Sequence, residues 1–188
     1  MRRYLLHIIT INLLLIGCNT ATKTLVIEAT DANLALQNGV LFYNEMPFTG
    51  VLETHNDNVV LIATITYVAG KKHGRETQWY GNGDLLLERF YANGFKTGIH
   101  KSWWPSGDLK FEYHFNNKGE FDGVVKEWYK SGQLFRDFNY NSGKEVGHQR
   151  MWKTDGTLKA NYKVVDGERY GVIGLKKCYT VTVGKDEI

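Results

Sequence analysis

Residues 70–85 read Gly70-Lys-Lys-His-Gly74-Arg-Glu-Thr-Gln-Trp79-Tyr-Gly-Asn-Gly83-Asp-Leu85, and this stretch decides the fold because residues 119–134 repeat its skeleton. In both stretches two glycines enclose three residues, and tryptophan stands five residues after the second glycine. A third glycine follows the tryptophan, and leucine comes two residues later. Recurrence of this kind at a fixed spacing indicates a repeat architecture.

The Gly-x-x-x-Gly pair recurs with spacings of 24, 25, 24 and 24 residues, beginning at Gly70, Gly94, Gly119, Gly143 and Gly167. The tryptophans in phase with it are Trp79, Trp103, Trp128 and Trp152, and the turn glycines in phase with it are Gly83, Gly107, Gly132 and Gly156. One further unit precedes these, with Gly50 and Leu61 in phase but His55 in place of tryptophan. Because degenerate terminal units usually cap an array, we expect Gly50→Val to destabilise the protein less than Gly107→Val.

Each unit predicts a β-hairpin. Asn82-Gly83 and its three equivalents stand between strand-like runs, and Asn-Gly favours a two-residue type I′ turn. After the turn, apolar and polar residues alternate, which is typical of a half-buried strand. With the Gly-x-x-x-Gly segments as connecting loops, the sequence predicts an all-β fold. We expect an elongated, single-layer antiparallel meander of tandem hairpins over residues 38–175, about 24 residues per repeat.

Two-residue turns would fix which residues oppose each other. One face, expected to be the core face, would pair Tyr80–Leu85, Trp104–Leu109, Tyr129–Leu134, Gln78–Leu87, Ser102–Phe111 and His100–Tyr113. The other would place Trp79, Trp103, Trp128 and Trp152 opposite Leu86, Lys110, Phe135 and Lys159, beside the pairs Lys101–Glu112 and Lys126–Asp137. The tryptophans form the candidate binding face. They could equally brace the sheet, with the stems of Lys110 and Lys159 covering their rings, and the two roles are compatible.

The phased pattern, as in Gly119 to Leu134, resembles bacterial MORN-type repeats and, more closely, the variant found in YwqK-family antitoxins. The resemblance covers about residues 38–175 and extends to the opening run from Phe42 to Gly50. Departures are His55 for tryptophan, Trp104 and Lys153 where tyrosine is usual, and one inserted residue near Asn117. The resemblance implies a hairpin-repeat fold and an antitoxin that neutralises a toxin by direct contact.

The first 18 residues resemble a bacterial lipoprotein signal. Arg2 and Arg3 precede an apolar run of 12 residues, Leu5 to Ile16, which is too short for a comfortable membrane span. The run ends in Leu15-Ile16-Gly17-Cys18, similar to a lipobox. The resemblance implies a signal peptide over residues 1–17, acyl chains on Cys18 that anchor the protein in a membrane of the cell envelope, and a tether or cap over residues 18–37. Residues 176–188 are expected to form a terminal strand and tail.

The composition excludes several other functions. The net charge is +3 and nearly neutral without Arg2 and Arg3, so a nucleic-acid partner is not expected. With Cys18 expected to carry acyl chains, Cys178 has no cysteine left to pair with and is read as a small buried residue. The sequence has no zinc-ligand spacing, no nucleophile elbow and no phosphate-binding loop, so we expect no metal, no cofactor, no small-molecule substrate and no enzymatic activity.

Three functions remain in competition. The first is a lipid-anchored protein-binding or scaffold module, with another envelope protein as its partner. The second is the antitoxin, which an anchor outside the cytoplasm would restrict to exported toxins. The third is a cell-wall glycan binder, against which stand the absence of Gly-Trp dipeptides and the period of 24 residues.

Overall fold

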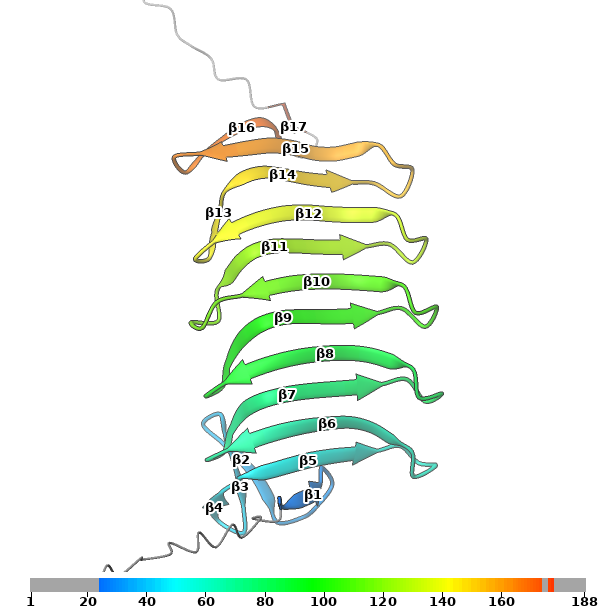
Figure 1. Cartoon of the computed structure of the whole chain (residues 1–188), viewed down its shortest axis with the longest axis vertical. Helices are drawn as coiled ribbons and strands as arrows, with labels where there is room; N and C mark the ends of the chain where they lie inside the picture. The colour runs from blue at the N-terminus through cyan, green and yellow to red at the C-terminus, as the bar shows by residue number, and fades with distance from the viewer. Residues whose placement is uncertain (1–23, 174–175, 178–188) are drawn as a thin grey trace, which may run out of the picture.

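The computed structural model describes residues 24–173 and 176–177, and every regular element in that part of the chain is a β-strand. The main sheet has 14 strands in the order β1-β5-β6-β7-β8-β9-β10-β11-β12-β14-β15-β16-β17, with β13 paired beside β12 (Figure 1). Since all neighbours from β5 onward are antiparallel and follow each other along the chain apart from the short β13, the predicted meander of tandem hairpins is confirmed.

The odd-numbered strands from β5 to β11, and β14, run toward the tryptophan ends of the hairpins, and the strands that follow them run back. The N-terminal strands are β1 (Val26–Glu28), β2 (Leu34–Gln37), β3 (Val40–Tyr43) and β4 (Met46–Pro47). The hairpin strands are β5 (Gly50–His55), β6 (Leu61–Val68), β7 (Lys71–Trp79), β8 (Leu85–Ala92), β9 (Phe95–Trp103), β10 (Leu109–Phe115), β11 (Phe121–Trp128), β12 (Leu134–Asn141), β13 (Lys144–Glu145), β14 (Gly147–Trp152), β15 (Leu158–Val165), β16 (Glu168–Ile173) and β17 (Lys176–Lys177).

The N-terminal end is closed by a cap that the repeat pattern did not predict. Strand β1 pairs in parallel with β5, and β2, β3 and β4 form a separate three-stranded sheet. Ile27, Leu41 and Phe48 are buried together between these elements, with Tyr67 of the first hairpin packed against them. This cluster covers the end of the sheet with apolar side chains, so the first hairpin packs against the cap on one side and against β7 on the other.

For the same reason, the structure predicts the opposite of the tolerance expected at Gly50. A Cβ atom at Gly50 would lie 2.2 Å from the Leu25 carbonyl oxygen and 3.0 Å from the Phe48 ring, whereas a Cβ at Gly107 would meet nothing within 4 Å. The first unit packs against the cap, and close packing makes it less tolerant of added atoms.

The turns beside the tryptophans have three residues, so the expected two-residue type I′ turns are wrong. The Gly83 amide donates to the Tyr80 carbonyl at 2.9 Å, and the Tyr80 amide donates to the Asp84 carbonyl at 2.8 Å. Gly83 has a φ of +90°, and Asn82 is not among the residues of positive φ. A tight turn closed by a left-handed glycine is the usual three-residue hairpin loop. Gly107, Gly132 and Gly156 repeat this geometry.

A β-bulge next to each turn restores the expected register further along the strands. Trp79 pairs with Leu85, not with Leu86, but the next pair is Gln78 with Leu87, as predicted. The longer loop shifts the pairing by one residue and the bulge shifts it back. The predicted pairs Ser102–Phe111, His100–Tyr113, Lys101–Glu112 and Lys126–Asp137 are therefore confirmed, and the predicted pairs of Tyr80, Trp104 and Tyr129 with the consensus leucines are wrong.

Two-residue turns occur instead at the opposite ends of the hairpins. Val68 pairs with Lys71 across Ala69-Gly70, whose φ angles are both positive, and Asn93-Gly94 connects Ala92 to Phe95 in the same way. Each Gly-x-x-x-Gly segment therefore forms the end of a turn and the first residues of the next strand, and not a loop as expected. Near Asn117 the inserted residue lengthens this turn to three residues.

The two faces of the sheet differ in composition. We call the face of Glu76 and Gln78 the core face, and from β7 onward it holds all the buried side chains except Thr77 and Asp137 among the described residues. These core-face side chains are Glu76, Leu87, Tyr91, His100, Ser102, Val125, Phe138, Gln149, Ala160, Tyr162 and Val164. The opposite face, which we call the charged face, carries a ladder of directly paired residues of alternating sign: Glu88, Lys101, Glu112, Lys126, Asp137 and Arg150.

Successive hairpins are joined by the aromatic residues that follow Trp79, Trp103 and Trp128. The Tyr80 hydroxyl donates to the Trp103 carbonyl at 2.8 Å, and the Tyr129 hydroxyl donates to the Trp152 carbonyl at 2.9 Å. The Trp104 indole makes the equivalent bond to the Trp128 carbonyl at 3.3 Å. Each bond satisfies a strand-end carbonyl of the next repeat and fixes the distance between neighbouring hairpins.

Candidate functional site

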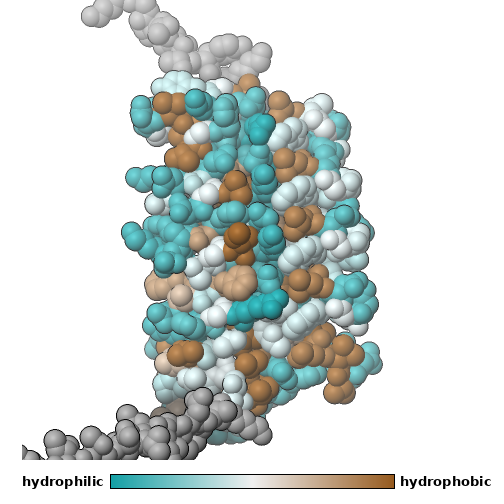
Figure 2. Space-filling model, viewed as in Figure 1, coloured by the Kyte–Doolittle hydropathy of each residue, from teal (hydrophilic) through white to brown (hydrophobic). Residues whose placement is uncertain are grey.

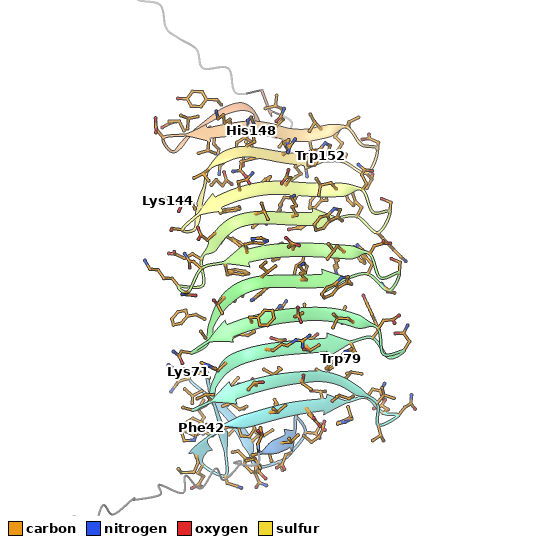
Figure 3. The ribbon with its side chains drawn as sticks, viewed as in Figure 1. Phe42, Lys71, Trp79, Lys144, His148 and Trp152 are labelled. Carbon is orange, nitrogen blue, oxygen red and sulfur yellow. The ribbon has the colours of Figure 1, made fainter. Side chains whose placement is uncertain are left out.

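The four repeat tryptophans lie in one row on the charged face, each beside the leucine it pairs with. We call this the Trp–Leu row, and it consists of Trp79, Leu85, Trp103, Leu109, Trp128, Leu134, Trp152 and Leu158. In Figure 2 brown patches recur in one column on the right, over the strand ends that carry Trp79 and Trp152 in Figure 3, with a teal column beside it. The repeat thus builds a continuous apolar stripe next to the charge ladder.

The rings of the row are half-buried, which fits both roles expected for them. None of the aromatic ring pairs among the described residues involves a repeat tryptophan, so leucine separates one indole from the next. Arg150 lies 5.6 Å from the Trp152 ring centre. The expected cover of Trp103 by Lys110 is wrong, because the bulge turns Lys110 to the core face, where its Nζ lies 4.6 Å from the Trp104 ring centre.

The charge ladder beside the row neutralises itself in large part. Arg75 pairs with Glu88, Lys101 Nζ lies 3.3 Å from Glu112 Oε2, and Arg150 Nη2 lies 2.7 Å from Asp137 Oδ2. Burial would raise the pKa of Glu112, but its hydrogen bonds to His114 and Lys101 outweigh burial and hold the pKa below its usual value. The charged face therefore offers apolar contact in one stripe and paired charges in the next.

A second candidate site, which sequence reasoning missed, is an open hollow of about 440 Å³ on the core face. We call it the aromatic hollow, and its lining includes Trp104, Lys110, Phe111, Tyr113, Tyr129 and Phe135, together with Trp128 of the Trp–Leu row at its edge. Phe111 stacks on Tyr113 with ring centres 4.3 Å apart, and Tyr129 lies 5.1 Å from Phe135. The one sequence signal for this hollow was Trp104 in place of the usual tyrosine. That Trp104 and Phe135 line the same hollow depends on the bulges.

The carboxylate in the aromatic hollow is already engaged by the protein. Glu127 Oε1 accepts hydrogen bonds from the Tyr113 hydroxyl and from Arg136 Nη1, both at 2.9 Å. Burial and the neighbouring Glu127 carboxylate both raise the pKa of Tyr113 far above its usual value. Tyr113 therefore stays protonated near neutral pH and serves as a hydrogen-bond donor to Glu127.

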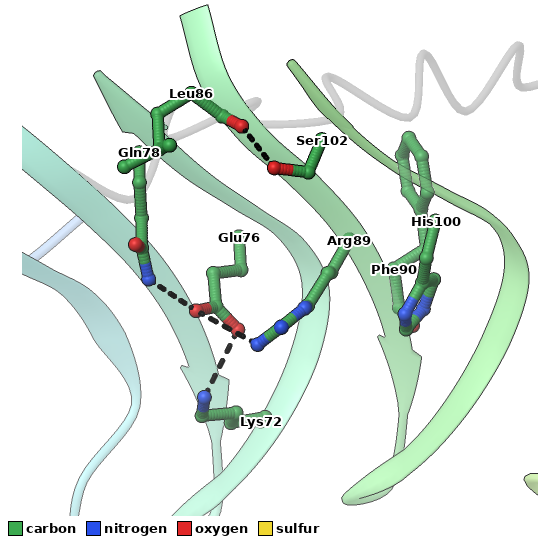
Figure 4. A network of polar contacts seen from close by, with 8 residues as sticks. All are labelled: Lys72, Glu76, Gln78, Leu86, Arg89, Phe90, His100 and Ser102. Atoms are coloured by element: carbon green, nitrogen blue, oxygen red, sulfur yellow. Dashed lines mark hydrogen bonds and ion pairs between the residues drawn. The ribbon is translucent and has the colours of Figure 1, made fainter. Parts of the chain in front are cut away.

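The polar side chains around Glu76 on the core face satisfy one another (Figure 4). Glu76, 2% exposed, accepts from Lys72 Nζ at 3.0 Å and from Gln78 Nε2 at 2.9 Å, with Arg89 3.9 Å away. Burial raises the pKa of Glu76, but the hydrogen bond and charge of Lys72 outweigh it, so the pKa is lowered. His100 bonds the Phe90 carbonyl at 2.9 Å, and burial lowers its pKa.

The remaining predicted sites are placed as follows. The glycines 83, 107, 132 and 156 all lie in the turns beside the Trp–Leu row. Cys18 and Cys178, like the expected signal peptide, lie outside the described residues. In the described part of the chain no three His, Cys, Asp or Glu side chains come together as they would to hold a metal ion. No helix within residues 24–173 and 176–177 has the length and apolar character of a membrane span.

Comparison with known protein families places three segments of the chain, residues 72–93, 96–117 and 121–142, in the MORN repeat variant. The three segments correspond to the hairpins β7–β8, β9–β10 and β11–β12, so the predicted MORN-type repeat is confirmed there. Such repeats are commonly protein- or membrane-binding modules and in general are not catalytic. Among curated proteins, none matches the chain. The closer resemblance to YwqK-family antitoxins remains a prediction.

Proposed function

We propose that this protein is a lipid-anchored, non-enzymatic binding module of the bacterial cell envelope that holds another envelope protein against its Trp–Leu row. The observation that carries the proposal is the row itself: alternating indole and leucine side chains, half-exposed, along the charged face of a sheet. A contiguous apolar stripe rimmed by polar residues is typical of a protein-interaction surface.

The geometry of the row suits an extended partner. Equivalent tryptophans stand two strands apart, so they recur about every 9.6 Å at the usual strand spacing. A single indole in a protein interface contributes about 1–2 kcal/mol or more to binding, and several in line sum to a specific contact. The self-paired charge ladder next to the row excludes partners that place an unpaired charge there.

The anchor half of the proposal rests on the lipobox-like sequence that ends at Cys18. Two or more acyl chains hold a protein stably at a membrane, because each buried CH₂ contributes about 0.8 kcal/mol. Cys18→Ser should abolish metabolic labelling by palmitate and release the protein on membrane washing. Full labelling of the Cys18→Ser variant would end this half of the proposal.

The binding half is tested by cross-linking in intact cells, followed by purification of the protein with whatever partner is attached. Trp128→Ala should weaken capture about tenfold with a modest change in melting temperature, whereas Tyr129→Ala should mainly lower the melting temperature. Leu158→Glu places a charge at the exposed end of the row, where Leu158 is 49% exposed, and should also reduce capture without unfolding the sheet.

Phe95→Ala is the matched control, because Phe95 is 57% exposed but lies at the opposite ends of the strands. It should leave capture unchanged. Capture that survives both Trp128→Ala and Leu158→Glu in folded protein would show that the Trp–Leu row is a brace and not the contact.

A further inference from the structure

The aromatic hollow is a local feature of one junction and not a property of the repeat. It lies where hairpin β9–β10 meets hairpin β11–β12, and Phe111 and Tyr113 form its floor. The equivalent floor positions in the hairpins before and after are Leu87 with Arg89, and Arg136 with Phe138. Stacked aromatic rings at this position therefore have no counterpart in either neighbouring hairpin, and the packing of the repeat does not require them.

The apolar character of the hollow favours a bulky apolar side chain as its occupant. The protein itself covers ring faces on which a sugar or a planar cation would stack, since Phe111 lies 10° from parallel with Tyr113 and Lys110 lies over Trp104. The Lys110 ammonium group also repels a second cation. What remains open is a recess between ring edges, where a side chain gains contact on several sides.

The charge around the hollow decides what flanks that side chain. Glu127 is neutralised by Arg136, 2.9 Å away. Lys110 and Lys130 take part in none of the ion pairs formed among the described residues. Lys110 and Lys130 are both exposed and both line the hollow. The rim is therefore positive, and complementary charge on a partner would be negative.

We propose that the aromatic hollow docks a large apolar side chain from an acidic segment of a partner protein, with Lys110 and Lys130 facing its carboxylates. This site opens on the core face, and Trp128 is the one residue of the Trp–Leu row that also lines it, so it stands whether or not the rest of the row binds a protein. A partner that used both surfaces would wrap around one edge of the hairpin turns.

The test uses the lipidated full chain in phosphatidylcholine nanodiscs and a synthetic peptide, acetyl-Asp-Glu-(4-fluoro-Phe)-Asp-Glu-amide, observed by fluorine NMR. The peptide signal should shift and broaden saturably on titration with the protein. A peptide with 3-fluoroalanine in place of the fluorinated phenylalanine should not bind, and a peptide with lysines in place of the four acidic residues should bind at least tenfold more weakly.

Variants of the protein locate the contact. Lys110→Gln combined with Lys130→Gln should weaken binding at least tenfold, and Phe111→Ala should abolish it. Lys159→Gln is the matched control, because Lys159 occupies the same repeat position as Lys110 two strands away from the hollow, and it should leave binding unchanged. Circular dichroism and the melting temperature of each variant show that the sheet is intact.

Three outcomes would overturn the proposal. Equal binding of the lysine-flanked peptide would remove the charge argument, and unchanged binding by folded Lys110→Gln, Lys130→Gln protein would move the contact elsewhere. Displacement of the probe by a second copy of the chain, seen as a concentration-dependent dimer that Phe111→Ala abolishes, would make the hollow a self-association site. Loss of partner capture by Leu158→Glu, which lies in the Trp–Leu row outside the hollow, affects none of these measurements.

Discussion

Gly50→Ala should destabilise the protein more than Gly107→Ala, although Gly107 is one of the turn glycines that recur in every regular repeat and Gly50 lies in the degenerate first unit. At Gly107 the added methyl group meets open space, and the cost is the left-handed backbone strain at a φ of +86°, about 1–2 kcal/mol. At Gly50 the methyl group would stand 2.2 Å from the backbone oxygen of Leu25, which cannot move without moving β1.

The cost of moving β1 follows from what β1 contributes. The Val51 amide donates to the Leu25 carbonyl at 2.8 Å, and Ile27, 9% exposed, packs against Leu41 and Phe48. Losing that hydrogen bond and unpacking one isoleucine costs about 3 kcal/mol or more. Gly50→Ala should therefore exceed Gly107→Ala by at least about 1 kcal/mol in the free energy of unfolding.

Urea unfolding followed by tryptophan fluorescence measures both free energies, and hydrogen exchange of the Val51 amide reports on β1 itself. We expect the protection of that amide to fall sharply in Gly50→Ala and to stay unchanged in Gly107→Ala, which lies four strands further along the sheet. If Gly107→Ala proves equally or more destabilising, the cap does not hold the first hairpin, and the original argument from repeat degeneracy is correct.

Three further perturbations probe the turn, the repeat junction and the buried histidine. Val59 holds the glycine position of the first turn with a φ of +61°, so Val59→Gly should raise the free energy of unfolding by about 0.5–1 kcal/mol, measured by urea titration. Tyr129→Phe removes the hydrogen bond to the Trp152 carbonyl and should cost about 0.5–1.5 kcal/mol by the same measurement; no loss would mean that the bond does not couple the repeats. Burial lowers the pKa of His100, so its neutral form stabilises the fold above about pH 6.5, the usual histidine pKa, and that contribution is lost as the pH falls through the lowered value; melting temperatures of His100→Gln should fall less between pH 7 and pH 5 than those of the parent.

Most of the fold could be predicted from the repeat period, because each residue type that recurs with this period has a local structural role. Glycine tolerates the left-handed backbone of a turn, and period-two alternation belongs to a strand with one buried face. The assignment of Lys101 and Glu112 to the same face as the tryptophans needed no more than these two rules. This assignment is correct although the predicted loop length is wrong, because the bulge reverses the one-residue register shift that the longer loop introduces.

Part of the candidate sites could not be predicted in this way. The aromatic hollow needed Lys110 and Phe135 on the core face, whereas strict alternation puts them with the tryptophans. A bulge forms only when two strands pair, and the residue types at Leu109-Lys110 do not indicate whether the pairing there is bulged or regular. The hollow therefore arises from pairing and is absent from the pattern of either strand alone.

By itself the sequence determined the all-β meander, its period and the faces of the hairpin residues away from the bulges, since spacing along one chain sets all three. Tertiary structure alone decided which ends of the hairpins have two-residue turns. Asn82-Gly83 and Asn93-Gly94 are the same dipeptide, but the first closes a three-residue loop and the second a two-residue turn. Tertiary structure also decided the cap, where β1 pairs in parallel with β5 about 25 residues away. Both choices depend on how strands pair with each other, and the pattern of one strand alone holds no information on that pairing.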